Sequence, residues 1–135
     1  MKYKYYLNKA KTMAEISDFH NQHIGCVVVY KNKILSAGCN SEKTHPIQRK
    51  YNSYRFDIHQ EYNPDCIHAE IQALIPISRM NIDMSKVKVF VYRKMKSRES
   101  GMARPCASCM AYIKRLGIKT IIYSTDDGYA VEKIS

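Results

Sequence analysis

Apolar residues recur at helical spacing in three parts of the chain and predict three helices. Across residues 6–18 they fall on one face, with lysine and glutamate between them, which is typical of an amphipathic helix. Residues 67–75 form a shorter apolar helix that we expect Pro76 to close. A third helix is expected over 105–116, because proline suits the first helical turn and Gly117 suits the stop.

Five runs rich in β-branched and aromatic residues predict strands. Lys31-Asn32-Lys33 separates the first two runs and Asp126-Asp127-Gly128 the last two, so each pair is expected to form an antiparallel hairpin. The third run follows a helix, and we expect it to lie parallel to a neighbouring strand. The order of elements predicts an α/β fold in which helices flank a mixed five-stranded sheet, within a single domain over 1–135. The strands are expected at 24–30, 34–39, 87–92, 118–123 and 129–134.

Residues 40–65 break the pattern, because they are polar, basic and aromatic and are interrupted by prolines. A segment of this kind can shape what enters a site, holding a phosphate with its cations and stacking a base on its rings. It can equally fold back as a short helix that packs for stability alone. The sequence is compatible with both alternatives. The residues that would contact a phosphate or a nucleic acid are Lys43, His45, Arg49 and Lys50.

The composition is that of a basic globular domain. Of 135 residues, 22 are lysine or arginine and 12 are aspartate or glutamate, which gives a formal net charge of +10. Such an excess favours phosphate-bearing or polyanionic partners, although a solvated lysine-rich surface gives the same count. No run of roughly 18 apolar residues occurs, and the first residues lack an apolar signal core, so we expect no membrane span, no secretory signal and a cytoplasmic protein.

Five cysteines are an odd number for a disulfide framework, and two of them stand in a Cys-x-x-Cys motif. Metal binding in a reducing compartment accounts for this pattern better than disulfides do. Cys26 and Cys39 fall in apolar runs and are expected to be core residues. Cys66 lies two residues before a histidine, but a three-ligand metal site is complete without it.

The Cys-x-x-Cys motif, Cys106 and Cys109, predicts half of a zinc site. Two thiols three residues apart on a helix project from one face, and the unpaired N–H groups of the first turn favour thiolates. His68 is the best-placed third ligand, because Glu70 two residues on can handle protons without ligating. Three protein ligands leave a fourth position open, which is typical of a catalytic zinc. A purely structural zinc would need a fourth protein ligand, for which the candidates are His45, His59 and Cys66.

His-x-Glu paired with Pro-Cys-x-x-Cys is the zinc signature of the base deaminases, and the chain resembles the cytidine deaminase-like superfamily, in particular compact, phage-type cytidine and deoxycytidylate deaminases. The resemblance implies a three-layer fold, with Zn2+ held by His68, Cys106 and Cys109 and protons moved by Glu70. It also leaves a homo-oligomer open, because related enzymes are commonly oligomeric. The resemblance runs through residues 25–30, 38–41, 66–70, 105–109, 116–118 and 123–124. The positions proposed as substrate contacts are Asn40, Ala69, Pro105 and Tyr123.

The implied reaction is hydrolytic deamination of cytosine to uracil. Zinc lowers the pKa of a bound water, and Glu70 carries protons to the ring nitrogen and to the departing amino group. We expect a free deoxycytidine or cytidine nucleotide such as dCMP as substrate, because a basic loop can bind one phosphate. Single-stranded DNA or RNA is the alternative that the charge supports, and adenine or a modified base is a further one. If the protein is not an enzyme, the alternative is a non-catalytic module that binds nucleic acid and whose fold is stabilised by zinc.

Overall fold

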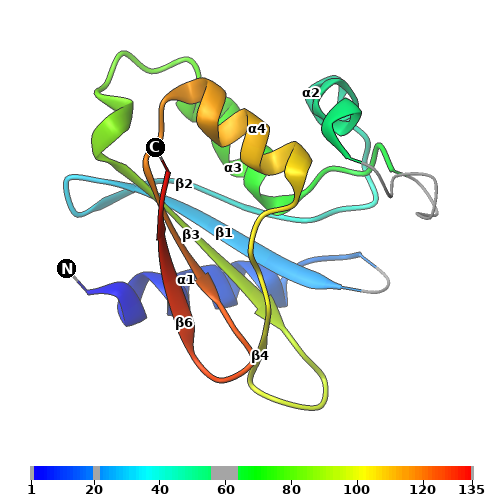
Figure 1. Cartoon of the computed structure of the whole chain (residues 1–135). Helices are drawn as coiled ribbons and strands as arrows, with labels where there is room; N and C mark the ends of the chain where they lie inside the picture. Colours follow the sequence, from blue (N-terminus) through cyan, green and yellow to red (C-terminus); the bar gives the residue numbers. More distant parts are fainter. Residues whose placement is uncertain (1, 20–21, 56–63, 135) are drawn as a thin grey trace.

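The computed structural model describes residues 2–19, 22–55 and 64–134, which form a mixed sheet with helices on both faces (Figure 1). The sheet order is β2-β1-β3-β5-β6, and the two-residue strand β4 pairs with β3. β3 and β5 are parallel, and the last hairpin, β5–β6, is antiparallel. The predicted mixed sheet of five strands is confirmed, and β4 is an addition to it. The elements are α1 (Tyr3–Glu15), β1 (His23–Tyr30), β2 (Lys33–Cys39), α2 (Pro46–Tyr51), η1 (Asn52–Tyr54), α3 (Ala69–Ile77), η3 (Met84–Lys86), β3 (Val87–Lys94), β4 (Ser100–Gly101), α4 (Ala107–Leu116), β5 (Thr120–Ser124) and β6 (Tyr129–Lys133).

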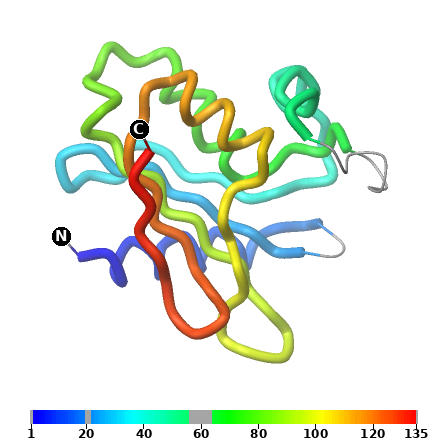
Figure 2. Tube along the Cα trace, viewed as in Figure 1, coloured from blue at the N-terminus to red at the C-terminus, as the bar shows by residue number. Residues whose placement is uncertain are grey.

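The strands divide their apolar side chains between two faces of the sheet by alternation. One face packs on α1 through Val27, Phe90 and Ile122. The other face, which includes Val28 and Ile121, packs on α3 and α4. Figure 2 shows α1 (blue) on one side of the sheet and α3 and α4 (green and orange) on the opposite side. The fold therefore has the three layers that were expected.

Helix boundaries differ from the predicted ones in three places. α1 begins and ends three residues earlier than predicted, and its first residue, Tyr3, packs its ring 5.9 Å from that of Phe90. α3 does not close at Pro76, which lies in its last turn, where the missing N–H removes only one helical bond. α4 begins one residue after Cys106, whose extended backbone makes it the N-cap. None of the described helices has the length and apolar character that a membrane span requires.

α3, the helix that follows His68, lies close against β2 at Gly38. A Cβ at Gly38 would lie 2.8 Å from the backbone nitrogen of Ala73 and 2.9 Å from the carbonyl oxygen of Ala69. Backbone atoms cannot move aside as a flexible side chain can, so only glycine allows this approach. The glycine thereby sets the depth at which the N-terminal end of α3 lies over the sheet.

Residues 46–54 of the polar segment form α2 and η1, which pack on α4 (Figure 1). The ring of Tyr51 lies 5.0 Å from that of Tyr112 on α4, and Tyr51 is buried. A short packed helix is therefore present, and substrate contacts by its cations stay a prediction. Phe56 and His59 of the same segment lie outside the described residues.

The cysteines outside the motif are free thiols. Cys26 is fully buried in the core, as predicted, and burial raises the pKa of its thiol. Cys39 ends β2 and is only half-buried, because β2 is the edge strand of the sheet.

Candidate metal centre

One imidazole and two thiols meet between the N-terminal ends of α3 and α4. His68 is the N-cap of α3, Cys106 is the N-cap of α4, and Cys109 lies in the first turn of α4. The Nδ1 atom of His68 lies 3.4 Å from the Sγ atom of each cysteine. Within the described ranges this is the one group of three or more His, Cys, Asp or Glu side chains close enough to share an ion. The predicted trio does come together, in a position to bind a metal.

The spacing and the donor atoms fit zinc. With a Zn–N distance of about 2.05 Å and a Zn–S distance of about 2.3 Å, a tetrahedral ion separates a nitrogen ligand from a sulfur ligand by about 3.6 Å. The observed separation between Nδ1 and each sulfur is 3.4 Å. One nitrogen and two sulfurs occupy three corners of a tetrahedron and leave the fourth for water or substrate, which is the pattern of a catalytic zinc.

The candidates for a fourth protein ligand make other contacts. The Sγ of Cys66 donates to the carbonyl oxygen of Glu42 at 3.3 Å. The Nδ1 of His45 accepts from the N–H of Ile47 at 3.1 Å and so caps α2. His59 lies outside the described residues. The described part of the chain therefore offers three ligands to the cluster.

The two thiols have opposite pKa shifts. A hydrogen bond from Cys109 lowers the pKa of the Cys106 thiol to about 3, with His68 adding to the effect and burial opposing it. Burial raises the pKa of Cys109 well above its ordinary value. Burial also lowers the pKa of His68, but the hydrogen bond and charge of Cys106 outweigh it and raise that pKa overall. The cluster thus holds a thiolate at Cys106, the form that ligates zinc.

Glu70 lies beside this cluster in the first turn of α3 and is only 5% exposed. Burial raises the pKa of its carboxyl to about 7, although the neighbouring His68 lowers it. A carboxyl with a pKa near neutrality can both accept and donate a proton at pH 7. The structure places Glu70 within reach of the cluster, and its role in proton transfer stays a prediction.

Asn40, a predicted substrate contact, follows β2 and is buried. Its Oδ1 accepts from the Ser17 hydroxyl at 2.6 Å and from the Ile24 N–H at 3.0 Å. Its Nδ2 donates to the carbonyl oxygen of Gln22 at 2.8 Å. These bonds join the end of β2 to the start of β1 and to the segment after α1, so Asn40 has a structural role whether or not it also contacts substrate.

Two further predicted contacts adjoin the cluster. Ala69 is the first residue of α3 and directly follows His68. Pro105 directly precedes Cys106. Both are buried, so any contact they make to a substrate is with atoms close to the metal position.

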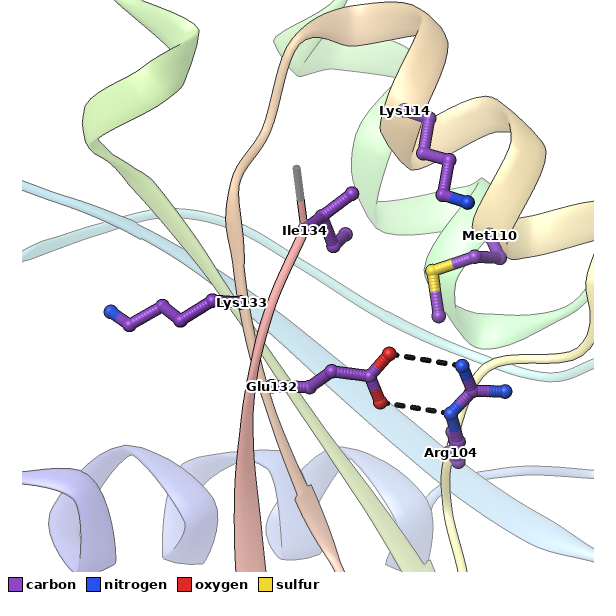
Figure 3. Close-up of a pocket in the computed structure, with 6 residues that line it drawn as sticks. All are labelled: Arg104, Met110, Lys114, Glu132, Lys133 and Ile134. Carbon is purple, nitrogen blue, oxygen red and sulfur yellow. Dashed lines mark hydrogen bonds and ion pairs between the residues drawn. The ribbon is translucent and has the colours of Figure 1, made fainter.

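Tyr123, the last of the predicted substrate contacts, lies on β5 and faces an ion pair. Its hydroxyl donates to the Oε1 of Glu132 at 3.2 Å. Glu132 in turn accepts two hydrogen bonds from Arg104, at 2.8 and 2.9 Å (Figure 3). Because Arg104 immediately precedes Pro105, the pair ties β6 to the segment that enters α4. The surface hollow beside the pair has a volume of about 200 Å3 and is lined by Arg104, Met110, Lys114, Glu132, Lys133 and Ile134.

The four predicted phosphate contacts lie in α2 or just before it. Lys43, Arg49 and Lys50 are exposed, and His45 is half-buried. The Nε of Arg49 lies 3.9 Å from the Oδ2 of Asp65, an ion pair open to solvent that restrains the arginine little. Because α2 packs on α4, these cations lie on the side of the sheet that carries the cluster (Figure 1).

Two residues that the sequence analysis did not single out contact the site. The Oε1 of Gln48 accepts from the backbone N–H of His68 at 2.9 Å. The Oδ1 of Asn52 accepts from the hydroxyl of Ser108, which lies between the two cysteines, at 3.0 Å. The sequence signal that could have identified Gln48 and Asn52 is the spacing of four residues between their amide side chains, which puts both on one helical face.

Comparison with known proteins supports both the fold and the chemistry. The sequence model of a family described as "Cytidine and deoxycytidylate deaminase zinc-binding region" matches residues 1–125. No curated protein sequence matches the chain.

Among solved structures, the apo dCMP deaminase of cyanophage S-TIM5 is 21% identical, with a TM-score of 0.62, and the match covers 91% of this chain and 82% of that one. The same enzyme in complex with dCMP and dUMP is 19% identical, with coverages of 90% and 79% and a TM-score of 0.62. The cytidine deaminase of Burkholderia pseudomallei is 18% identical, with coverages of 98% and 93% and a TM-score of 0.67. At these identities the structural matches establish a shared fold.

Proposed function

Because the chain belongs to the cytidine and deoxycytidylate deaminase family of zinc-dependent hydrolases, we propose that it converts cytosine to uracil on a free nucleotide such as dCMP. The observation that carries the proposal is the meeting of three metal-ligand side chains beside the buried carboxyl of Glu70. A metal with an open position and a neighbouring carboxyl is the arrangement that hydrolytic deamination needs.

Glu70 performs the proton transfers in this proposal. When bound, zinc supplies the Lewis acidity that makes water nucleophilic near neutral pH. Glu70 takes a proton from the water and passes one to ring nitrogen N3, which makes C4 of the base electrophilic. The water oxygen forms a bond to C4, and Glu70 then passes the second proton of that oxygen to the 4-amino group. The C4–N bond breaks as the C4 carbonyl forms, so that cytosine and water give uracil and ammonia. A carboxyl is suited to both tasks because it is a competent base when ionised and a competent acid when protonated.

Residues adjoining the ligands are the best supported of the proposed substrate contacts. Ala69 and Pro105 are each one residue away from a ligand and are buried, so a base at the open metal position would lie next to them. Asn40 and Tyr123 already use polar side-chain atoms in hydrogen bonds within the protein. We therefore propose that they act mainly by shaping the walls of the site.

The free nucleotide is supported by the cations of α2 and by a structural neighbour. Arg49 and Lys50 are exposed in the last turn of α2 and can reach a single phosphate. The cyanophage enzyme described above, which shares the fold, is known in complex with dCMP and dUMP. The net charge of +10 also favours the alternative, cytosine within single-stranded DNA or RNA.

A comparison of three substrates tests the proposal. Purified zinc-loaded protein is incubated with deoxycytidine, with dCMP and with a cytosine-containing single strand, and uracil formation is measured for each. We expect the largest kcat/KM for dCMP. A larger kcat/KM for the single strand would favour the polynucleotide alternative, and absence of uracil from all three would contradict the proposal.

Removing the two cations of α2 is expected to weaken binding of the substrate's phosphate group and nothing else. The double variant Arg49→Gln, Lys50→Gln should raise KM for dCMP about tenfold, equivalent to about 1.4 kcal/mol of lost binding. KM for deoxycytidine should stay unchanged, because the nucleoside carries no phosphate for these cations to hold. If a single strand is the substrate, the same variant should instead reduce the salt slope of binding by about 1.4, because each phosphate contact contributes about 0.7 to the slope on a single strand.

A matched charge change on the far side of the sheet is the control. Lys4→Gln, Lys9→Gln removes the same two charges from exposed positions of α1. If this control raises KM for dCMP as much as the α2 variant does, the phosphate is attracted by the overall electrostatic field of the protein. No local contact in α2 is then needed to explain the effect. Equal effects of the α2 variant on dCMP and deoxycytidine would exclude a phosphate contact there.

A further inference from the structure

A chain of buried polar side chains connects α2 to both halves of the metal site. Gln48 is fully buried, Asn52 is 3% exposed and Ser108 is fully buried. The Nε2 of Gln48 donates to the Oδ1 of Asn52 at 2.9 Å, and the Ser108 hydroxyl donates to the same oxygen at 3.0 Å. At its other end, the Oε1 of Gln48 accepts from the backbone N–H of His68 at 2.9 Å. The chain of bonds therefore runs from His68 to the turn of α4 that holds the cysteines.

Each amide in this chain has only one orientation that satisfies its neighbours. The His68 backbone group can only donate, so the oxygen of Gln48 must face it and the nitrogen must face Asn52. The nitrogen of Asn52 donates to the carbonyl oxygen of Pro64, which can only accept. Its oxygen therefore faces Gln48 and Ser108, and both of its acceptor positions are filled. The donor and acceptor directions thus agree along the whole chain.

The metal ligands need such a connection because they come from separate elements. His68 lies ahead of α3, whereas Cys106 and Cys109 belong to α4. The imidazole of His68 is turned toward the sulfurs and makes no capping bond to α3. Its backbone N–H is instead held by the Oε1 of Gln48. Burial leaves these amides without water as a replacement partner, so a shift of either half would break a bond that nothing else restores.

We propose that Gln48 and Asn52 are positioning residues for the zinc site, which fix His68 at the correct distance from Cys106 and Cys109. α2 then positions the metal ligands in addition to presenting exposed cations. The inference rests on the zinc site of the proposed function and on no assumption about its substrate. Zinc binding can be measured without any substrate, so a failure here is distinguishable from a failure of the proposed reaction.

Gln48→Met tests the proposal, because methionine keeps the volume and the apolar stem but neither accepts from His68 nor donates to Asn52. We expect the zinc dissociation constant, measured by competition with a chelator of known affinity, to rise about 10–100-fold. The thiolate-to-metal absorption of the cobalt-substituted protein should shift as well, because the angle between imidazole and sulfurs relaxes.

Gln72→Met is the matched control. Gln72 is a glutamine of α3 whose Oε1 also accepts from a backbone N–H, that of Cys39 at 2.7 Å, but this bond leads to β2 and not to the cysteines. Each variant loses one glutamine–backbone bond, and Gln48→Met also loses its bond to Asn52, so unfolding of the zinc-free forms in urea is measured to separate the loss of stability from the loss of zinc affinity. The proposal is overturned if both variants bind zinc as tightly as the parent protein, or if both lose the same amount of zinc affinity. In either case the role of Gln48 is only structural.

Ser108→Ala keeps the test decisive if Gln48→Met does not fold. It removes one donor to Asn52 and leaves every other bond in place. We expect zinc to bind between about twofold and tenfold more weakly, the effect of one net hydrogen bond. Unchanged zinc affinity and an unchanged cobalt spectrum in a folded Ser108→Ala protein would overturn the proposal.

Discussion

Replacing Glu70 with glutamine is expected to lower kcat by about 10²–10⁴-fold, the usual range for loss of a general acid–base group. Glutamine has the same shape but cannot accept and return a proton at its side-chain oxygen. The loss should lie toward the upper end of the range, because Glu70 is proposed to act at both N3 and the departing amino group. The measurement is kcat for dCMP together with the zinc content of the purified variant.

Zinc content decides how a loss of activity in Glu70→Gln is interpreted. Glu70 is not among the three clustered ligands, so the variant should retain one zinc per chain. Glu15→Gln is a suitable control, because Glu15 is an exposed carboxylate of α1 that pairs with Lys94 at 3.3 Å on the other side of the sheet. Normal deamination by a zinc-loaded Glu70→Gln protein would contradict the proposed mechanism. Loss of zinc would mean that the carboxyl holds the site together.

The metal centre could be predicted because its signal is local. His-x-Glu and Cys-x-x-Cys are short motifs, and each can be recognised from neighbouring residues alone, so only their pairing across 38 residues has to be inferred. The same holds for the strands, whose β-branched runs mark their places in the sequence. What the motif could not show is the conformation at Cys106, which is an N-cap and not a helical residue. Both cysteines still face one ligand position, because an N-cap side chain lies next to the first turn.

The support around the metal could not be predicted, because it depends on tertiary contacts. Gln48 and Asn52 lie in a polar segment, where amides are expected to face water, and only the packing of α2 on α4 shows that they face inward. Asn40 illustrates the reverse case. Nothing in the sequence indicated that its side chain makes three hydrogen bonds within the protein, and a substrate contact by Asn40 stays a prediction. Pro76 is a further case, because a proline predicts a helix end, whereas α3 continues through it to Ile77.

Replacing Cys109 with serine is expected to abolish zinc binding and, with it, most of the stability that zinc contributes. A serine hydroxyl is a poor zinc ligand, and Cys109 is fully buried, so no other group can take its place. At a free zinc concentration a thousand times Kd, a bound ion stabilises the folded state by about 4 kcal/mol. For a chain of this size that corresponds to roughly 10–20 °C in Tm. The measurement is Tm with and without a chelator, together with zinc content and uracil formation.

The comparison between two buried cysteines makes this prediction specific to the metal. Cys66 is also buried, but its thiol donates to the carbonyl oxygen of Glu42, a bond that a serine hydroxyl can make equally well. Cys66→Ser should therefore keep its zinc, its activity and its response to chelator. The chelator should lower Tm in the parent and in Cys66→Ser, and should leave Cys109→Ser unchanged, because that variant has no zinc to lose. Retention of one zinc per chain by Cys109→Ser, or loss of zinc by Cys66→Ser, would show that a different set of ligands holds the ion.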